Sequence, residues 1–332
     1  MEKIKIGIVG LGWVSQVFHI PQLLKIEDVE IVGVCDKNKE RARFIAERFN
    51  IKKYYNDYDQ LLKSDTDVIF VCTSTDAHCA ITKAALEAGK DVFVEKPIAR
   101  LHSEAEEMAE CARVNKRKLM VGMNNRFRPD SMILKSFIDK GELGKVFYCK
   151  SGWFKNVTSN NTWLTKKDLS GGGVILDLGI VIIDLALWML DFPSVARVTT
   201  KTFQHTTKSV EDSAIILIEL KGGTTLFVET SWSFKSEEDF FYCNFYGTEG
   251  SAMINPLRVH KQLHGNLVNV TPAKVESSQN LHKKSYENEL RHFIGAVRGL
   301  HPIISTGDEA AKRMKVVEAI YHAAKKGKEV TI

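Results

Sequence analysis

A glycine-rich turn near the amino terminus constrains the fold of this chain more than any other feature. Residues 10–15 read Gly-Leu-Gly-Trp-Val-Ser and directly follow the apolar, β-rich run Ile4–Gly10. In such a turn Gly10 permits a tight bend, and Gly12 lets the backbone come close to a diphosphate. Ser15 is small enough for the following helix to pack on the strand, and the start of that helix offers free N–H groups to an anion. The pattern predicts a strand–turn–helix unit that binds a dinucleotide.

An acidic residue at the end of the next β-rich run, Val29–Asp36, strengthens this interpretation. Asp36 takes the place of the carboxylate that follows such a turn by about 20 residues and binds the ribose hydroxyls. It would also repel a 2′-phosphate, although the adjacent Lys37 softens that repulsion. The pattern favours NAD, with NADP as the alternative; a solvated turn aspartate is the structural alternative for Asp36. The predicted cofactor contacts here are Gly10, Gly12, Trp13, Val14, Asp36 and Lys37.

The pattern of the chain changes near residues 124–130. Up to Met123, short apolar runs alternate with helical patterns, and such runs predict a parallel sheet covered on both faces. After Asp130 the strand-like runs follow one another with few helices between them, and Lys221–Gly223 and Gly247–Gly250 are hairpin signals. A chain of 332 residues is also too long to fold around a single hydrophobic core of ordinary size. We predict an α/β protein: a doubly wound Rossmann domain, residues 1–124, and an α+β domain with a large, mostly antiparallel open-faced sheet, residues 125–332.

Composition argues against several classes of partner. The 46 basic and 41 acidic residues give a net charge of +5 without a dense basic block, so no nucleic-acid partner is expected. The longest apolar stretch, 174–190, is interrupted by Asp177 and Asp184, which argues against a membrane span. The six cysteines form no CxxC pair, and we expect reduced thiols in a cytoplasmic protein. No His/Cys/Asp cluster has the spacing of metal ligands, so no metal is expected.

A second candidate site lies in the segment Val94-Glu95-Lys96-Pro97, at the end of a later predicted strand. The carboxyl ends of parallel strands open into the ligand crevice of such a sheet. A lysine there, partly desolvated and close to a cationic nicotinamide, exchanges a proton with a substrate hydroxyl more readily. Pro97 fixes the chain behind it, and a cis bond is one way of doing so. The alternative for Lys96 is a surface lysine in a turn.

In the glycine-rich turn, the run that ends at Asp36 and the Glu95-Lys96-Pro97 turn, the chain resembles the glucose–fructose oxidoreductase and inositol dehydrogenase family (Gfo/Idh/MocA). The matching segments are VGLGWVSQ, VCDKNKERA, VCTSTDAH, AGKDVFVEKP, GMNNRFRPD, GELGKV, SGGGVILDLG and YENELRHF. The resemblance implies a Rossmann domain, an α/β domain whose open sheet supports homo-oligomers (a dimer or tetramer), and Lys96 near the reacting carbon. It also implies cofactor contacts from Thr73, Ser74, His78, Glu95 and Asn124, and a substrate contact from Asn125. A helix-start residue is the alternative for His78.

The resemblance breaks in one informative place. Family dehydrogenases carry D-x-G-x-H-x-x-D, whereas this chain has Val181 at the histidine position, between Asp177 and Asp184. Regular helical spacing would put these residues and Trp188 on one face. Asp177 is the predicted catalytic partner of Lys96, and the predicted substrate-facing residues are Asn125, Trp163, Val181, Asp184 and Tyr286. Structural alternatives are helix capping for Asp177, a hydrogen bond for Asp184 and packing for Trp163.

These observations favour an NAD(P)-dependent oxidoreductase that acts on a secondary alcohol or ketone of a sugar, cyclitol or sugar derivative. Because valine neither donates nor accepts a proton, a cofactor-binding protein without turnover, such as a sensor or partner subunit, is an alternative. NAD-assisted glycosidase-type chemistry is another.

Overall fold

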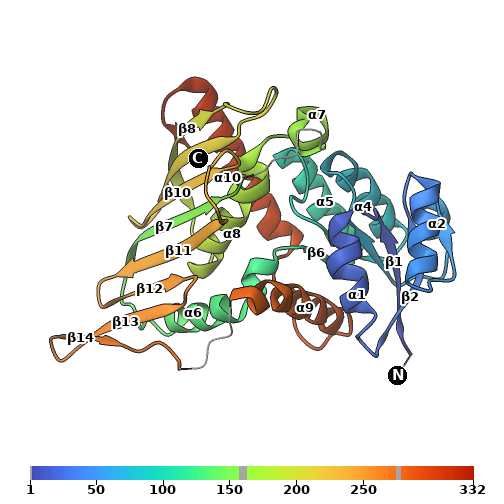
Figure 1. The fold of residues 1–332 in the computed structure, drawn as a ribbon, viewed down its shortest axis with the longest axis horizontal. Helices are drawn as coiled ribbons and strands as arrows, with labels where there is room; N and C mark the ends of the chain where they lie inside the picture. Colours follow the sequence, from blue (N-terminus) through green and yellow to red (C-terminus); the bar gives the residue numbers. More distant parts are fainter. Residues whose placement is uncertain (1, 157–162, 274–277) are drawn as a thin grey trace. The chain divides into compact units, whose positions relative to one another are not determined.

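The chain forms two compact units, and neither is one continuous stretch (Figure 1). The computed structural model describes residues 2–156, 163–273 and 278–332. The first unit comprises residues 1–123 and 286–311, and the second comprises residues 124–285 and 312–332. The predicted division at residue 124 was contiguous, whereas here a late segment returns to the first unit.

A parallel sheet with the strand order β3-β2-β1-β4-β5-β6 forms the centre of the first unit. This is the doubly wound order, so the predicted Rossmann fold is confirmed. Every residue of β4 and β5 is buried, as near-continuous apolar runs require when helices cover both faces. The strands are β1 (Ile4–Val9), β2 (Val29–Cys35), β3 (Tyr54–Tyr55), β4 (Val68–Val71), β5 (Asp91–Val94) and β6 (Leu119–Val121).

Helices alternate with these strands in residues 1–123, as the helical patterns between the apolar runs predict. They are α1 (Ile20–Leu23), α2 (Lys39–Arg48), α3 (Tyr58–Leu62), α4 (His78–Glu87) and α5 (His102–Val114). Gly89, just beyond α4, has a φ of +76°, as a glycine that terminates a helix often does. Ser103 and Glu106 have the spacing of a capping box, which predicts an N-cap at Ser103, and this prediction is wrong. The N-cap is Leu101, two residues earlier, and the Glu104 carboxylate accepts hydrogen bonds from the N–H groups of Arg100 and Leu101.

The returning segment is attached to the edge strand β6. The N–H of Val121 donates to the Ser305 carbonyl over 2.9 Å, and the Ser305 hydroxyl donates to the Val121 carbonyl over 2.8 Å. Both long C-terminal helices, α9 (Ser278–Val297) and α10 (Gly307–Lys326), cross from one unit to the other. The open edge of the parallel sheet is thereby covered by chain from the other end of the sequence, which also protects it from pairing with another molecule.

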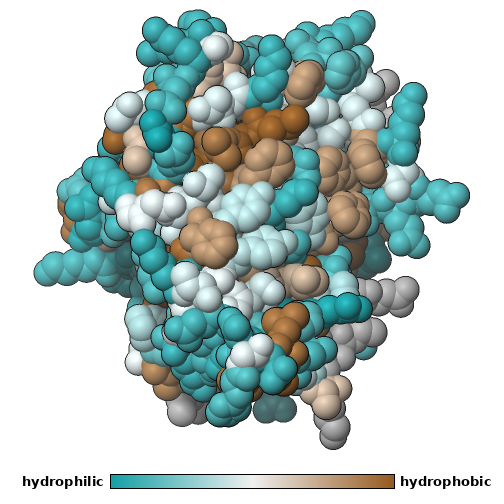
Figure 2. Space-filling view, turned by 90° about the vertical axis from the view of Figure 1, so that its left-hand side faces the viewer, coloured by the Kyte–Doolittle hydropathy of each residue, from teal (hydrophilic) through white to brown (hydrophobic). Residues whose placement is uncertain are grey.

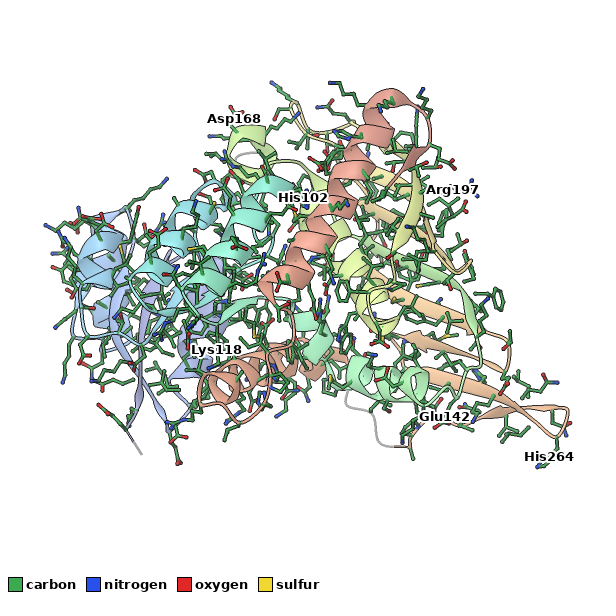
Figure 3. All side chains as sticks on the ribbon, turned by 180° about the vertical axis from the view of Figure 1, so that it is seen from behind. His102, Lys118, Glu142, Asp168, Arg197 and His264 are labelled. Atoms are coloured by element: carbon green, nitrogen blue, oxygen red, sulfur yellow. The ribbon has the colours of Figure 1, made fainter. Side chains whose placement is uncertain are left out.

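The second unit is built on one wide sheet with the order β14-β13-β12-β11-β7-β10-β9-β8-β15. Within the described residues its neighbouring strands are antiparallel, apart from β7 and β10, which run parallel. Arg197, on β8 beside the edge strand β15, and His264, at the β13–β14 turn, lie toward opposite ends of this sheet (Figure 3). The strands are β7 (Val146–Phe154), β8 (Val195–Phe203), β9 (Ser213–Leu220), β10 (Thr225–Ser231), β11 (Phe240–Gly247), β12 (Gly250–Ile254), β13 (Arg258–Leu263), β14 (Asn266–Asn269) and β15 (Val330–Thr331).

Helices cover one face of this sheet. The helix α8 (Ile180–Met189) contacts β7, β10 and β11, and all ten of its residues are buried. The stretch Lys167–Met189 is long and apolar enough to cross a membrane by composition, but 94% of its most apolar window is buried inside the protein. Such burial is the pattern of a core helix. The unit also contains α6 (Pro129–Asp139) and α7 (Lys167–Ser170).

Candidate functional site

The two glycines of the amino-terminal turn are required for different reasons. Gly10 has a φ of +92°, and a Cβ there would lie 2.5 Å from the Cys72 carbonyl, so the fold itself requires glycine. A Cβ on Gly12 would meet nothing within 4 Å, and no positive φ demands glycine there. The fold therefore leaves open space in front of Gly12, where a diphosphate needs to approach the backbone. The third small residue, Ser15, is fully buried and donates its hydroxyl to the Gly10 carbonyl over 2.6 Å.

Asp36 is fixed against this turn. Its carboxylate accepts the N–H of Leu11 over 3.0 Å and the N–H of Asn38 over 2.9 Å, and only 6% of the residue is exposed. Arg41, on the first turns of α2, lies 3.3 Å from the same carboxylate. A carboxylate has about four acceptor positions, so sites remain for ribose hydroxyls. The open turn, the anchored acid and the helix behind them fit an adenine dinucleotide. Lys37, the predicted contact next to Asp36, is exposed, whereas Arg41 was not predicted.

The Glu95-Lys96-Pro97 turn follows β5 directly at the carboxyl edge of the sheet. The Lys96–Pro97 peptide bond is cis, and Lys96 is half-buried. One oxygen of Glu95 accepts the main-chain N–H of Lys96 over 3.1 Å, and the other lies 2.6 Å from His19 Nε2. His19 belongs to the π-helical turn Ser15–His19 that follows the glycine-rich turn. No motif signals this histidine, because its partner lies 76 positions away.

His78 ties two neighbouring strand ends together. Its Nδ1 lies 2.9 Å from the Pro97 carbonyl and its Nε2 lies 3.1 Å from the Thr73 carbonyl, and the residue is 1% exposed. Burial lowers the pKa of this imidazole, against the hydrogen bonds to Pro97 and Thr73. The ring thereby joins the loop after β4, with Thr73 and Ser74, to the turn after β5. Both of its nitrogens face main-chain oxygens.

A row of aromatic rings extends from the glycine-rich turn. Trp13 is 66% exposed and makes an edge-on contact with Phe18, with ring centroids 5.3 Å apart. Phe18 stacks on Tyr286 at 4.1 Å, and Tyr286 in turn meets His19 edge-on at 5.9 Å. Tyr286, predicted as a substrate contact, is half-buried in this row, and Val14 is also half-buried.

In the second unit, Asp177 lies within a π-helical turn, Ile175–Gly179. Its carboxylate accepts the indole N–H of Trp232 over 3.0 Å, a partner that the sequence did not indicate. A π-turn has more residues per turn than an α-helix, so the regular spacing assumed between Asp177 and Val181 is not kept. Val181 is 4% exposed within α8.

Asp184 is held by two guanidinium groups. Arg126 donates Nε and Nη2 to it over 2.8 and 2.6 Å, and Arg313 donates to the same carboxylate. Although burial opposes ionisation, the two arginines outweigh it and hold the pKa of Asp184 below its usual value. Asp184 is 1% exposed, and both arginines are fully buried.

The triple glycine before Asp177 has a packing explanation. A Cβ on Gly172 would lie 2.0 Å from the Tyr321 hydroxyl, and one on Gly173 would lie 1.9 Å from the Glu211 carbonyl. The Glu211 carboxylate accepts the N–H groups of Gly173 and Ile175 over 2.9 and 3.1 Å, and the Tyr321 hydroxyl over 2.8 Å. Burial raises the pKa of Glu211. This contact fixes the start of the turn that carries Asp177.

The other predicted site residues of the second unit lie on segments other than the one that carries Asp177. Asn124 is half-buried and donates to the Ser285 hydroxyl over 2.9 Å, and Asn125 is 4% exposed. Trp163 begins a short 3-10 turn, Trp163–Thr165, and is half-buried. Across the described ranges, no group of three or more His, Cys, Asp or Glu side chains is arranged to hold a metal ion.

Comparison with known proteins identifies both halves of the chain. An oxidoreductase family with an NAD-binding Rossmann fold matches residues 4–123, and its C-terminal α/β domain matches residues 135–332. The D-glucoside 3-dehydrogenase of Escherichia coli (strain K12) is 29% identical, over 100% of this chain and 98% of that protein. The scyllo-inositol 2-dehydrogenase (NAD(+)) of Bacillus subtilis (strain 168) is 28% identical, over 100% and 97%. A levoglucosan dehydrogenase solved with NADH and levoglucosan has the same fold, with a TM-score of 0.90 at 19% identity over 100% of both chains.

Proposed function

The chain belongs to the Gfo/Idh/MocA family of NAD-binding oxidoreductases, and we propose that it transfers a hydride between NAD and a secondary alcohol or ketone of a sugar, cyclitol or sugar derivative. The observation that carries this proposal lies within the first unit. The open space at Gly12, the anchored Asp36 and the Lys96 turn all stand at the carboxyl edge of one parallel sheet. The groups that would bind the diphosphate, bind the ribose and transfer a proton thus lie along one edge of the sheet. The sugar dehydrogenases among the relatives support the substrate class.

In this proposal the residues of the chain bind, orient and move a proton. NAD, when bound, supplies the hydride acceptor. The backbone at Gly12 takes the diphosphate, and Asp36 takes the ribose hydroxyls. Lys96 Nζ accepts the hydroxyl proton of the substrate as the hydride leaves, and returns it in the opposite direction. Asp177 is the second catalytic residue that we propose, after Lys96, while Asp184 holds α8 through its two arginines.

One residue favours a second candidate function, a cofactor-binding protein without turnover. Val181 is apolar and buried at the position where the family resemblance leads one to expect a histidine. A sensor or partner subunit retains the cofactor site and needs no second proton carrier. Retention of the Glu95-Lys96-Pro97 turn favours catalysis over this alternative.

Cofactor titration and an activity screen test the proposal together. We expect calorimetry to show NAD binding at least about tenfold tighter than NADP, since Asp36 repels a 2′-phosphate. Asp36→Ala should narrow that gap, because Arg41 is then free to pair with the phosphate. NAD reduction, followed at the nicotinamide absorbance with glucosides, free sugars, sugar acids and cyclitols, should identify a substrate. Equal binding of both cofactors would overturn the preference, and cofactor binding without turnover across the panel would favour the second candidate.

The uncovered face of the second unit's sheet supports a further part of this proposal, a homo-oligomer. Strand β9 alternates strictly: Ile216 is fully buried, whereas Ile215 and Leu217 are 44% and 36% exposed on the other face. Figure 2 shows apolar side chains gathered in the middle of this side of the molecule, with hydrophilic ones around them. An apolar patch with a polar rim is typical of an interface. Leu217→Lys should therefore lower the mass measured by light scattering; an unchanged mass would exclude this face.

A further inference from the structure

The strongest unassigned feature of the first unit is the buried pair His19–Glu95. The ring of His19 has no exposed surface, the Glu95 side chain is 13% exposed, and 2.6 Å separates Nε2 from the carboxylate. The second oxygen of Glu95 receives the main-chain N–H of Lys96, so the carboxylate directly adjoins the lysine turn. A buried histidine seldom takes such a position without a role, since an ionised carboxylate at this depth needs a partner.

We propose that His19 is a positioning residue that carries a positive charge and neutralises Glu95 beside Lys96, so that Lys96 can release its own proton. The inference rests on the proposed function, because it concerns the residue that we assign to proton transfer. It adds a residue that lies on another element, far from the lysine in sequence.

The surroundings of His19 explain how the charge is held. Phe70, Phe93 and Tyr286 surround the ring, with centroids 5.9, 5.4 and 5.9 Å away. The titratable groups that face it are Cys72 at the end of β4, Glu95 at the end of β5 and Tyr286 on α9. Burial works against the charged imidazole, but Cys72 and Glu95 outweigh it and raise the pKa of His19 to about 10. For Glu95, burial is likewise outweighed, chiefly by His19, and its pKa is lowered.

The consequence for Lys96 follows from charge balance. A lone carboxylate next to an ammonium group stabilises the protonated lysine and makes it a poorer proton acceptor. An imidazolium on the far side of that carboxylate cancels much of this attraction. Lys96 then stands beside a pair that is nearly neutral as a whole, while Glu95 remains free to fix the turn through the Lys96 N–H.

Two variants separate this electrostatic role from a purely structural one. His19→Gln removes the positive charge and leaves Glu95 uncompensated, so Lys96 should hold its proton to a pH about 1 unit higher. In the double variant His19→Gln/Glu95→Gln both charges are absent, and the proton should again leave near the wild-type pH. If His19 served only packing, the double variant would be at least as disturbed as the single one.

The first measurement does not depend on turnover. The full-length wild type and both variants are labelled with acetic anhydride from pH 6 to 11, and the reactivity of Lys96 is followed by peptide mass spectrometry. The exposed Lys37 serves as internal control. We expect the midpoint for Lys96 to rise in His19→Gln and to return in the double variant. A midpoint that is unchanged in His19→Gln, or that rises further in the double variant, overturns the inference.

Histidine ¹⁵N spectra provide an independent check on the charge, with the His19 signals assigned by their loss in His19→Gln. Both ring nitrogens should be protonated at pH 8 in the wild type, and a neutral ring there would overturn the inference. Where a substrate is found, the acid limb of kcat/KM should move as the labelling midpoint moves. A protein without turnover but with the expected labelling and spectra would contradict the proposed function and leave the His19 pair supported.

Discussion

The first unit has a largely buried carboxylate, Glu95, at the end of a strand, whereas the second has one, Asp184, in the middle of a helix. Glu95 follows β5 and keeps 13% of its side chain exposed, with one histidine as its charged partner. Asp184 lies within α8, is 1% exposed and has two arginine partners. A strand end opens to the crevice where ligands bind, so its acid remains accessible to chemistry. A helix in the core has no such opening. The carboxylate of Asp184 therefore serves only to pair with the two arginines that pack around it.

Removing the carboxylate of Asp184 should have the largest effect of these substitutions on the free energy of unfolding. Asp184→Ala leaves Arg126 and Arg313 without their carboxylate, and breaking a buried pair in this way costs about 3–5 kcal/mol of unfolding free energy. Urea denaturation measures it. The control is Glu107→Ala, which removes a carboxylate that lies within helix α5, is 57% exposed and pairs with Lys83; it should cost less than about 0.5 kcal/mol. Equal losses in the two variants would contradict the structural role assigned to the buried Asp184.

The same carboxylate should make the protein sensitive to acid. The pKa of Asp184 is lower in the folded than in the unfolded chain. Its contribution to stability is therefore present above the unfolded value, about 3.9, and is lost as the pH falls through the folded value. Urea titrations at falling pH should show the wild type losing stability below about pH 4. Asp184→Ala should show a smaller loss over the same range.

At the strand end, the largest effect is expected on rate and not on stability. Lys96→Met removes the proposed proton carrier, so turnover should fall by at least about 100-fold while NAD affinity stays within about tenfold. Steady-state assays with the identified substrate and calorimetry with NAD measure both. If turnover persists, the proton is carried elsewhere; if NAD affinity collapses, Lys96 serves binding.

The two glycines of the turn, Gly10 and Gly12, separate effects on stability from effects on NAD binding within one unit. Gly12→Ala has space for its methyl group in the folded protein, so stability should change by less than about 0.5 kcal/mol. NAD affinity should fall about tenfold, since the methyl group occupies the place of the diphosphate. Gly10→Ala is the matched control: its positive φ and its contact with Cys72 should destabilise the fold by about 1–3 kcal/mol. Thermal melts with and without NAD separate the two.

The smallest effect is expected at Val181. If this position faces the substrate, Val181→His adds an imidazole near Asp177 and should give a new limb near pH ~6.5 in the rate profile, with a change in turnover of a few-fold. Val181→Leu controls for the added volume. A rate, affinity and pH profile that all stay as in the wild type would mean that residue 181 does not line the site.

The sequence predicted the first unit in more detail than the second. Strands β1, β2, β4, β5 and β6 lie within the apolar runs that the sequence predicts as strands, 4–10, 29–36, 67–73, 91–97 and 118–123, because buried parallel strands are continuous apolar runs. In the second unit the strand-like runs are 145–153, 212–220, 224–234, 240–247 and 251–255, so β8, β13, β14 and β15 were not predicted. The two-residue β15 is short, and β14 is exposed at every position, so neither carries a hydrophobic pattern. Their pairing depends on neighbours distant in sequence.

In the candidate site, too, the sequence did not predict contacts between residues that are distant along the chain. The glycine-rich turn, Asp36 and the Lys96 turn were identified from sequence, because local spacing expresses their chemistry. Arg41, His19, Trp232 and the arginines around Asp184 were not identified, since each acts through a residue that it meets only in the folded chain.

What the sequence by itself determined is the type of fold and the local geometry of the turns, because steric limits on glycine and proline and the period of apolar residues act between near neighbours. It also determined the family, through motifs spread along the whole chain. Only the tertiary structure decided which buried charges meet: that Glu95 has His19 beside it, and that Asp184 is held by Arg126 and Arg313. The physical reason is that burial and charge pairing depend on distances in space, which the order of residues along the chain does not express.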